Sequence, residues 1–211
     1  RRNLIINGAM QVAQRGTSSS TTNGAWGVDR FQLSYGAGTL AVQQVTDAPS
    51  GYTHSLKITQ SAYGSASYKL IQHYVEGFNI SGLAYGTSDA KSITLSFWVK
   101  ASVTGTYSVT LQNAASGGSR LSYVTTYVVD SADTWEQKTI TITGSTSGTW
   151  YTDNQRGLGV LFDLGSTPYA TSTLDSWQVA NVFSATGAVD LSNNSGATLQ
   201  ITGVQLEVGS V

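Results

Sequence analysis

Apolar and polar residues alternate with a period of two along much of this chain. In SITLSFWVK (92–100), every second residue from Ile93 to Val99 is apolar, and in KTITIT (138–143) two isoleucines alternate with threonines. Such alternation predicts antiparallel strands that bury one face. Similar segments recur between turn-rich stretches, which predicts strands over 39–45, 54–60, 68–75, 92–100, 106–111, 121–129, 138–143, 158–162 and 198–206.

The two ends of the chain are both strand-like. The closing segment alternates through Leu199 and Ile201, then its apolar parity slips at Gly203 and resumes at Val204. A parity slip at a glycine is typical of a β-bulge. We therefore expect a closing strand with a bulge at Gly203, lying beside or near a first strand formed by residues 1–10.

The remaining pattern favours an all-β chain. No long amphipathic helix is evident, and residues 76–85 are predicted to hold a short helix or turn between strands. We predict an antiparallel β-sandwich of jelly-roll type, as a single domain over 1–211. Because residue 1 is Arg and not Met, we expect the chain to be part of a longer protein.

Composition excludes several classes of function. Charged residues make up 11% of the chain and the net charge is −1, so the chain as a whole lacks the basic balance expected of nucleic-acid binding. The apolar runs are too short to insert into a membrane. The absence of cysteine excludes disulfides, thiolate metal sites and cysteine nucleophiles.

Catalytic signatures are weak. His54 and His73 lie in strand-like segments, and we interpret both as half-buried or solvent-facing rather than as metal ligands or bases. The acids are scattered and mostly turn-like, without the paired spacing of a glycosidase. Glu76 ends a strand, and we interpret it as a structural cap or a partner for Arg30. These observations predict a chain that is not an enzyme.

Aromatic residues beside amides and acids are typical of carbohydrate sites, because sugar rings stack on flat side chains while their hydroxyls bind amides and carboxylates. The loop 149–155 and the segment 167–177 have this character, and Trp98 lies opposite the apolar parity of its strand. Burial against a loop or a subunit contact is the alternative for each, and we expect core or edge packing for Trp135. The candidate carbohydrate-binding residues are Trp150, Tyr151, Asp153, Asn154, Tyr169 and Trp177.

Several motifs occur together in a recognisable order: NLIINGAMQVAQRG, VDRF, QHYVEG, TLSFWVKAS, DTWEQKTITITG and ITGVQLEVGSV. Over essentially its whole length the chain resembles the C-terminal domains of tail-fibre and virion structural proteins of marine phages, especially those of cyanobacteria. That family resembles a divergent carbohydrate-binding-module jelly roll. The resemblance implies a virion protein, a homotrimer, and contacts with other virion proteins.

In the modules that this family resembles, acids of the opening and closing strands often hold a structural calcium ion. Here Gln11, Thr202 and Gly203 stand at the corresponding positions. Calcium prefers anionic oxygen ligands, so we expect no calcium, and no other cofactor, at this place.

Fold alone does not fix function. The first hypothesis is a phage tail-fibre or appendage domain in the virion that binds a host cell-surface glycan without cleaving it. The second is a structural decoration or assembly module of the capsid or tail. The third is a polysaccharide depolymerase.

Overall fold

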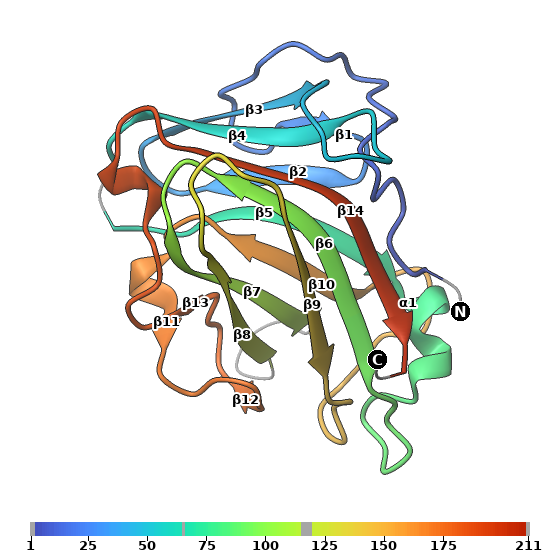
Figure 1. Ribbon diagram of the computed structural model, residues 1–211. Coiled ribbons are helices and arrows are strands. Elements are labelled where there is room, and N and C mark those ends of the chain that lie inside the picture. Colours follow the sequence, from blue (N-terminus) through green and yellow to red (C-terminus); the bar gives the residue numbers. More distant parts are fainter. Residues whose placement is uncertain (1–2, 65, 115–119, 210–211) are drawn as a thin grey trace.

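Two antiparallel sheets face one another in the computed structural model, which describes residues 3–64, 66–114 and 120–209 (Figure 1). The seven-stranded sheet has the order β1-β2-β5-β10-β7-β8-β12 and the five-stranded sheet the order β3-β4-β14-β6-β9. The first consists of Trp26–Val28, Phe31–Tyr35, Lys69–Glu76, Arg156–Asp163, Gly105–Asn113, Leu121–Val129 and Trp177–Val179. The second consists of Thr39–Val45, Ser55–Ala62, Thr198–Val208, Ile93–Ala101 and Glu136–Ile142.

The remaining elements are short. After β5 come α1 (Gly77–Ile80) and the 3-10 turn η1 (Ser81–Leu83), as residues 76–85 predict. Further 3-10 turns and a parallel two-stranded pair follow β10: η3 (Thr167–Tyr169), β11 (Ala170–Thr171), β13 (Ser184–Ala185) and η4 (Leu191–Asn193). No helix among the described residues has the length and apolar character needed to cross a bilayer.

The core lies between the two sheets. Phe97 of β6 meets Phe162 of β10 and Tyr127 of β8 edge-on, with ring centroids 5.1 and 5.0 Å apart. The alternation in β6 places Ile93, Leu95, Phe97 and Val99 in this core, all with 0% exposure. Burial of these side chains is the main stabilising contribution to the sandwich.

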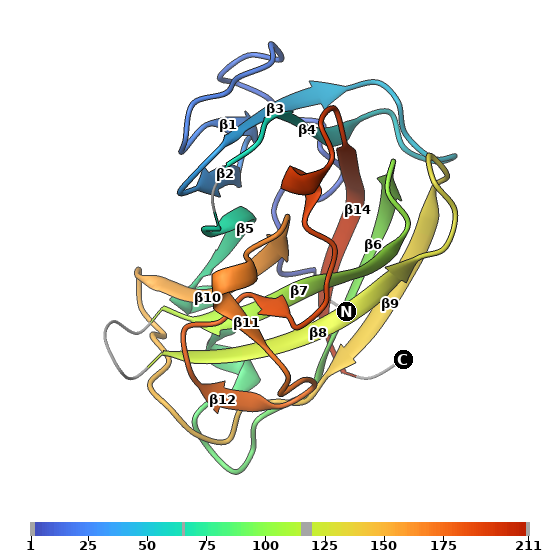
Figure 2. The same cartoon turned by 90° about the vertical axis from the view of Figure 1, so that its left-hand side faces the viewer.

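The segment after β10 crosses the outer face of the seven-stranded sheet (Figure 2). Hydrogen bonds fix it to β7. The Thr110 hydroxyl donates to the Phe183 carbonyl at 2.9 Å, and the Ala185 amide donates to Ser108 Oγ at 2.8 Å. The segment covers part of β7 and β8 and leaves the β2, β5 and β10 side of that face uncovered by its strands.

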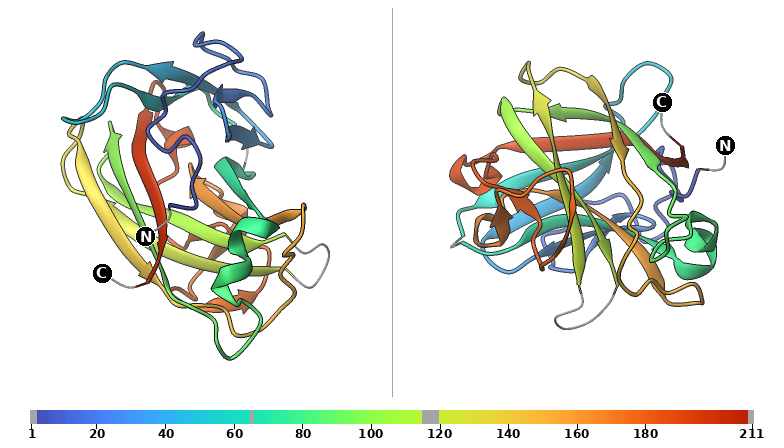
Figure 3. Two further views of the ribbon diagram at one scale, coloured as in Figure 1. Left: turned by 90° about the vertical axis from the view of Figure 1, so that its right-hand side faces the viewer. Right: turned by 90° about the horizontal axis from the view of Figure 1, so that it is seen from below.

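The two ends of the chain lie side by side, as expected (Figure 3). The Leu4 amide donates to the Leu206 carbonyl at 2.8 Å, and the Val204 amide donates to the Gly8 carbonyl at 3.0 Å. The expected first strand is wrong, however, for the described residues 3–10. Asn7 and Met10 take positive φ angles of 60° and 56°, which bend the segment into turns along β14.

The bulge at Gly203 is confirmed. Between the pairs Thr202–Trp98 and Gln205–Ser96, β14 contains one residue more than β6. Gly203 has a φ of 61°, the left-handed conformation that a glycine adopts without steric cost. The inserted residue shifts the alternation by one position, so that Val204 and Leu206 are buried on the same face as Leu199 and Ile201.

Candidate functional site

The exposed part of the seven-stranded sheet is built on the alternation of β5. Ile71, His73 and Val75 point into the core, while Gln72 and Tyr74 point outward and are half-buried. His73 is therefore 1% exposed, and the expectation of a half-buried or solvent-facing histidine is wrong.

A glycine on the neighbouring strand makes room for the Tyr74 ring. Tyr74 pairs with Gly159 of β10. A Cβ atom at Gly159 would lie 3.0 Å from the Tyr74 ring, so glycine there permits the ring to approach the β10 backbone closely. The outward side of β5 therefore presents an aromatic ring next to an amide.

A hollow of about 240 Å³ lies on this face. The crossing segment forms one of its sides, with Tyr169, Asn181 and Phe183. We call it the tyrosine hollow, and its lining consists of tyrosines, amides and apolar residues with one arginine: Ser34, Tyr68, Leu70, Gln72, Tyr74, Gln112, Arg120, Leu161, Tyr169, Asn181 and Phe183.

Hydrogen bonds orient the polar groups of the tyrosine hollow. The Tyr74 hydroxyl donates to Gln72 Oε1 at 2.8 Å, and Gln112 Nε2 donates to Asn181 Oδ1 at 3.2 Å. The rings of Tyr68 and Tyr169 meet edge-on at 6.4 Å. Burial raises the pKa of Tyr74, so its hydroxyl stays protonated at neutral pH.

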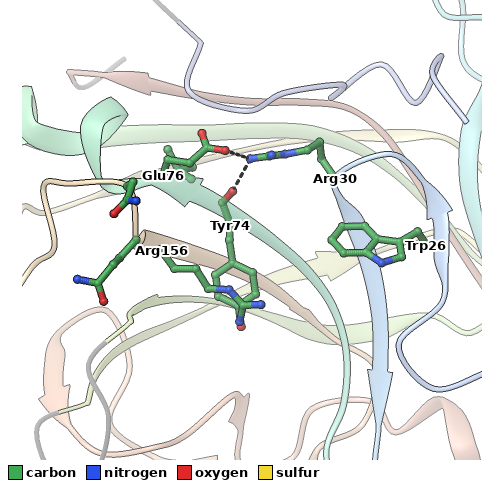
Figure 4. Close-up of a pocket in the computed structure, with 8 residues that line it drawn as sticks. Trp26, Arg30, Tyr74, Glu76 and Arg156 are labelled. Atoms are coloured by element: carbon green, nitrogen blue, oxygen red, sulfur yellow. Dashed lines mark hydrogen bonds and ion pairs between the residues drawn. The ribbon is translucent and has the colours of Figure 1, made fainter. Parts of the chain in front are cut away.

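A second hollow, of about 180 Å³, shares Tyr74 with the first. We call it the arginine hollow, and the two together the groove. Its lining residues are Trp26, Arg30, Tyr74, Val75, Glu76, Asn154, Gln155 and Arg156. Figure 4 shows it with the Tyr74 ring between β5 and Arg156.

An ion pair organises the arginine hollow. Arg30 Nη2 lies 2.6 Å from Glu76 Oε1 and also donates to the Tyr74 carbonyl at 3.3 Å. The interpretation of Glu76 as a partner for Arg30 is confirmed. The hydrogen bond from Arg30 lowers the pKa of Glu76, so the carboxylate is ionised at neutral pH. The Arg156 guanidinium lies over the Tyr74 ring, 4.2 Å from its centroid.

The groove combines flat aromatic faces with oriented amides and cations, and it offers few groups for acid–base chemistry. Glu76 is the one carboxylate among the residues that line the two hollows. No group of three or more His, Cys, Asp or Glu residues suited to a metal ion occurs in the described part of the chain. The arrangement is one for binding a ligand rich in hydroxyl groups.

The six candidate residues from the sequence are not gathered at one place. Trp150 and Trp177 pack edge-on at 5.2 Å, and Tyr85 packs against both rings. Trp150 is 9% exposed, and its indole N–H donates to the Ser147 carbonyl. The indole of Trp177 donates to the Thr143 carbonyl at 2.8 Å. These contacts within the chain correspond to the packing alternative.

The other four candidates lie nearer the groove. Asn154 lines the arginine hollow and Tyr169 lines the tyrosine hollow. Tyr151 and Asp153 lie in the loop before β10, outside both linings. Asp153 is engaged locally, because its carboxylate accepts hydrogen bonds from the backbone and side-chain amides of Gln155.

Two further tryptophans lie on the other sheet. Trp98 is half-buried in β6, where it pairs with Gln137 and Thr202 on the outer face of the five-stranded sheet. Trp135 precedes the edge strand β9, and its indole donates to Asp47 Oδ1 at 3.3 Å. Of the core or edge packing expected for Trp135, the structure shows packing at the edge.

Sequence reasoning missed most of the groove. Gln72 and Tyr74 were not among the candidates from the sequence. In KLIQHYVE, however, every second position from Gln72 on carries a polar or aromatic side chain (Gln72, Tyr74 and Glu76), and a tyrosine on the outward face of a strand is not needed for packing the core. That alternation was the available signal. The contributions of Asn181 and Arg120 depend on tertiary contacts between segments far apart in the chain, and the sequence pattern does not contain them.

Comparison with known proteins rests on structure alone. No family model matches the chain, and no curated protein matches it. The enzymatically active domain of tailspike protein 4 of bacteriophage CBA120 aligns with 98% of this chain at a TM-score of 0.55 and 11% identity. The chain spans 21% of that protein's length.

Two further structures align over nearly their whole length. A Bacteroides thetaiotaomicron protein described as a candidate sugar binder has a TM-score of 0.54 and 13% identity, with 98% of this chain and 100% of that chain covered. A structure entitled "CBM4 structure and function" has a TM-score of 0.49 and 14% identity, with 97% and 99% covered. The two antiparallel sheets form a jelly-roll β-sandwich, a fold shared with the tailspike domain and the Bacteroides protein. The expected fold class is confirmed.

Proposed function

We propose that the protein is a non-catalytic glycan-binding module and that the groove on the seven-stranded sheet is its binding site. The observation that carries this proposal is the joining of outward-facing, half-buried tyrosine rings to oriented amides on one face of the seven-stranded sheet. Tyr74 and Tyr169 provide the aromatic contacts to the sugar rings. Gln72 and Asn181 bind the hydroxyl groups around them.

The carboxylates of the groove favour a binding role over a hydrolytic one. Glycosidases commonly use two carboxyl groups about 5–10 Å apart, one of them with a raised pKa. Glu76 stands alone among the lining residues, and Arg30 lowers its pKa. Such a group is a poor proton donor at neutral pH. The depolymerase alternative is tested by incubating the protein with host polysaccharide and measuring released reducing ends, where none are expected.

The proposed location is the virion, in a phage tail fibre or related appendage that contacts a host cell-surface glycan. The sequence motifs support this, as does the shared fold with a phage tailspike domain. A homotrimer, bound to other virion proteins, presents several copies of a weak site, and multivalency then multiplies the affinity. Light scattering after size exclusion tests the trimer: a mass of three chains is expected, and a monomer contradicts it.

The rival proposal is a structural module with aromatic residues at subunit contacts. Trp150 and Trp177, the residues that suggested it, pack against their own chain. Their packing leaves the outward-facing, half-buried tyrosines of the groove as the aromatic contacts for a ligand.

A glycan array tests the binding proposal. The wild type is compared with Tyr74→Ala and Tyr169→Ala, and with Tyr63→Ala as a matched control, because Tyr63 is 72% exposed and lines neither hollow. We expect each groove variant to lose at least ~10-fold in affinity, as central aromatic contacts do, and the control to bind normally. An absence of array binding by the wild type, or unchanged binding in both groove variants, contradicts the proposal.

A further inference from the structure

The arginines of the described chain gather on one side of the molecule. Arg30 and Arg156 line the arginine hollow, and Arg120 lines the tyrosine hollow. Arg15 lies over the ring of Trp26, 4.9 Å from its centroid, at the edge of the arginine hollow. All four arginines of the described residues thus lie in or beside the groove.

Three of the lysines lie on the five-stranded sheet. Lys57 lies on the five-stranded sheet, and Lys100 and Lys138 of that sheet are engaged by Asp47, Asp130 and Glu136. The groove lining holds three arginines against Glu76, a local charge of +2 in a chain whose net charge is −1. The groove is therefore electropositive relative to the rest of the protein, which favours an anionic ligand.

Arg156 is the cation best placed for a ligand. Its side chain is exposed, and in the described residues no carboxylate lies within ion-pair distance of it. It lies over Tyr74, the ring shared by the two hollows. A planar guanidinium that stacks by its face keeps its N–H edge for a carboxylate, which it binds with two parallel hydrogen bonds.

We infer that the ligand of the groove is an acidic glycan whose sugars carry carboxylate groups, with a carboxylate bound by Arg156 and the sugar ring packed beside the Arg156–Tyr74 pair. This inference rests on the proposed function and specifies its substrate class. The amides of Gln72, Gln112 and Asn181 favour a sugar over a nucleic acid, because they suit hydroxyl groups placed around a sugar ring.

The test uses uronate polymers and their neutral counterparts. Oligomers of polygalacturonate and alginate are compared with their carboxyl-esterified forms by calorimetry, against wild type, Arg156→Gln and Lys57→Gln. Lys57→Gln removes the same charge from the opposite sheet and is the matched control. We expect at least one uronate to bind roughly 10- to 100-fold more tightly than its ester. Arg156→Gln should lose that preference, Lys57→Gln should keep it, and salt should weaken the uronate complex.

The outcomes separate this inference from the proposed function. Glycan binding on the array without binding of either uronate, equal binding of acid and ester, or an Arg156→Gln variant that keeps the preference overturns the acidic-ligand inference and leaves the glycan site standing. Binding of oligothymidylate as tight as that of the uronate overturns it in favour of a general polyanion site. No glycan binding at all removes both.

Discussion

Gly203 forms the bulge that the sequence pattern predicts in the closing strand β14. Its replacement by alanine tests whether the bulge depends on glycine. Its φ of 61° is left-handed, a conformation that costs a non-glycine residue about 1–2 kcal/mol. The cost does not stop at the backbone. A Cβ atom at this position would lie 2.7 Å from two atoms of the Tyr52 side chain, well inside ordinary contact distance.

The two contributions are separable. Displacing Tyr52 is an overpacking event of about 1–3 kcal/mol, so Gly203→Ala should lower the free energy of unfolding by about 2–5 kcal/mol in total. In a Tyr52→Ala background the clash is absent, and the cost of Gly203→Ala should fall to the backbone contribution of about 1–2 kcal/mol.

Urea denaturation followed by tryptophan fluorescence measures these differences. The control is Gly187→Ala, because Gly187 has a φ of 83° and a Cβ there would meet no atom within 4 Å. It should lose only the backbone contribution of about 1–2 kcal/mol. If Gly203→Ala is no less stable than Gly187→Ala, or if removing Tyr52 brings no relief, then the bulge does not depend on glycine and the reasoning is wrong.

Three further predictions concern buried groups. Burial lowers the pKa of His73 to about 4, so the unfolded chain binds the extra proton between pH 4 and 6.5. The contribution of His73 to the free energy of unfolding should rise by up to ~3 kcal/mol across that window, and His73→Phe should remove this contribution in a pH series of urea midpoints. Burial raises the pKa of Asp163 to about 6. The contribution of Asp163 to the free energy of unfolding should therefore fall as pH increases from about 4 to 6, and Asp163→Asn should abolish this fall. Trp150→Ala should cost about 3 kcal/mol in urea denaturation and leave array binding unchanged, because its ring packs in the core.

Strands with clean alternation were predictable from sequence. All nine strands expected between residues 39 and 206 are present, and those over 39–45 and 121–129 match β3 and β8 residue for residue. The short strands β1, β2 and β12 were missed, because three to five residues give too little periodicity to separate a strand from a loop. Their positions depend on pairing with longer strands.

The opening segment shows where pattern reasoning fails. NLIINGAM has the apolar content of a strand, yet Asn7 holds it in a turn by accepting from the Val12 amide and donating to the Asp29 carbonyl. Asparagine tolerates the left-handed region and forms such local bonds readily. The apolar residues Leu4 and Ile5 still reach the core, although the segment does not form the expected strand.

The site was harder to predict than the fold because a groove is assembled from several strands. The combination of aromatic residues and amides within one loop pointed to Trp150, but the Trp150 indole packs in the core. In the structure, Tyr74 from β5 meets Arg156 from β10 and lies in one lining with Asn181 of the crossing segment. Only the register of β5 against β10 brings the first two together, and sequence spacing does not encode that register.

Hydrogen exchange with and without the glycan that gives the strongest array signal tests the central claim most directly, since it maps the bound face without substitutions. If the groove is the binding site, protection should appear in peptides covering residues 68–76 and 167–183. Peptides over 56–60 and 94–100 of the five-stranded sheet should be unchanged. Protection confined to the five-stranded sheet contradicts the account.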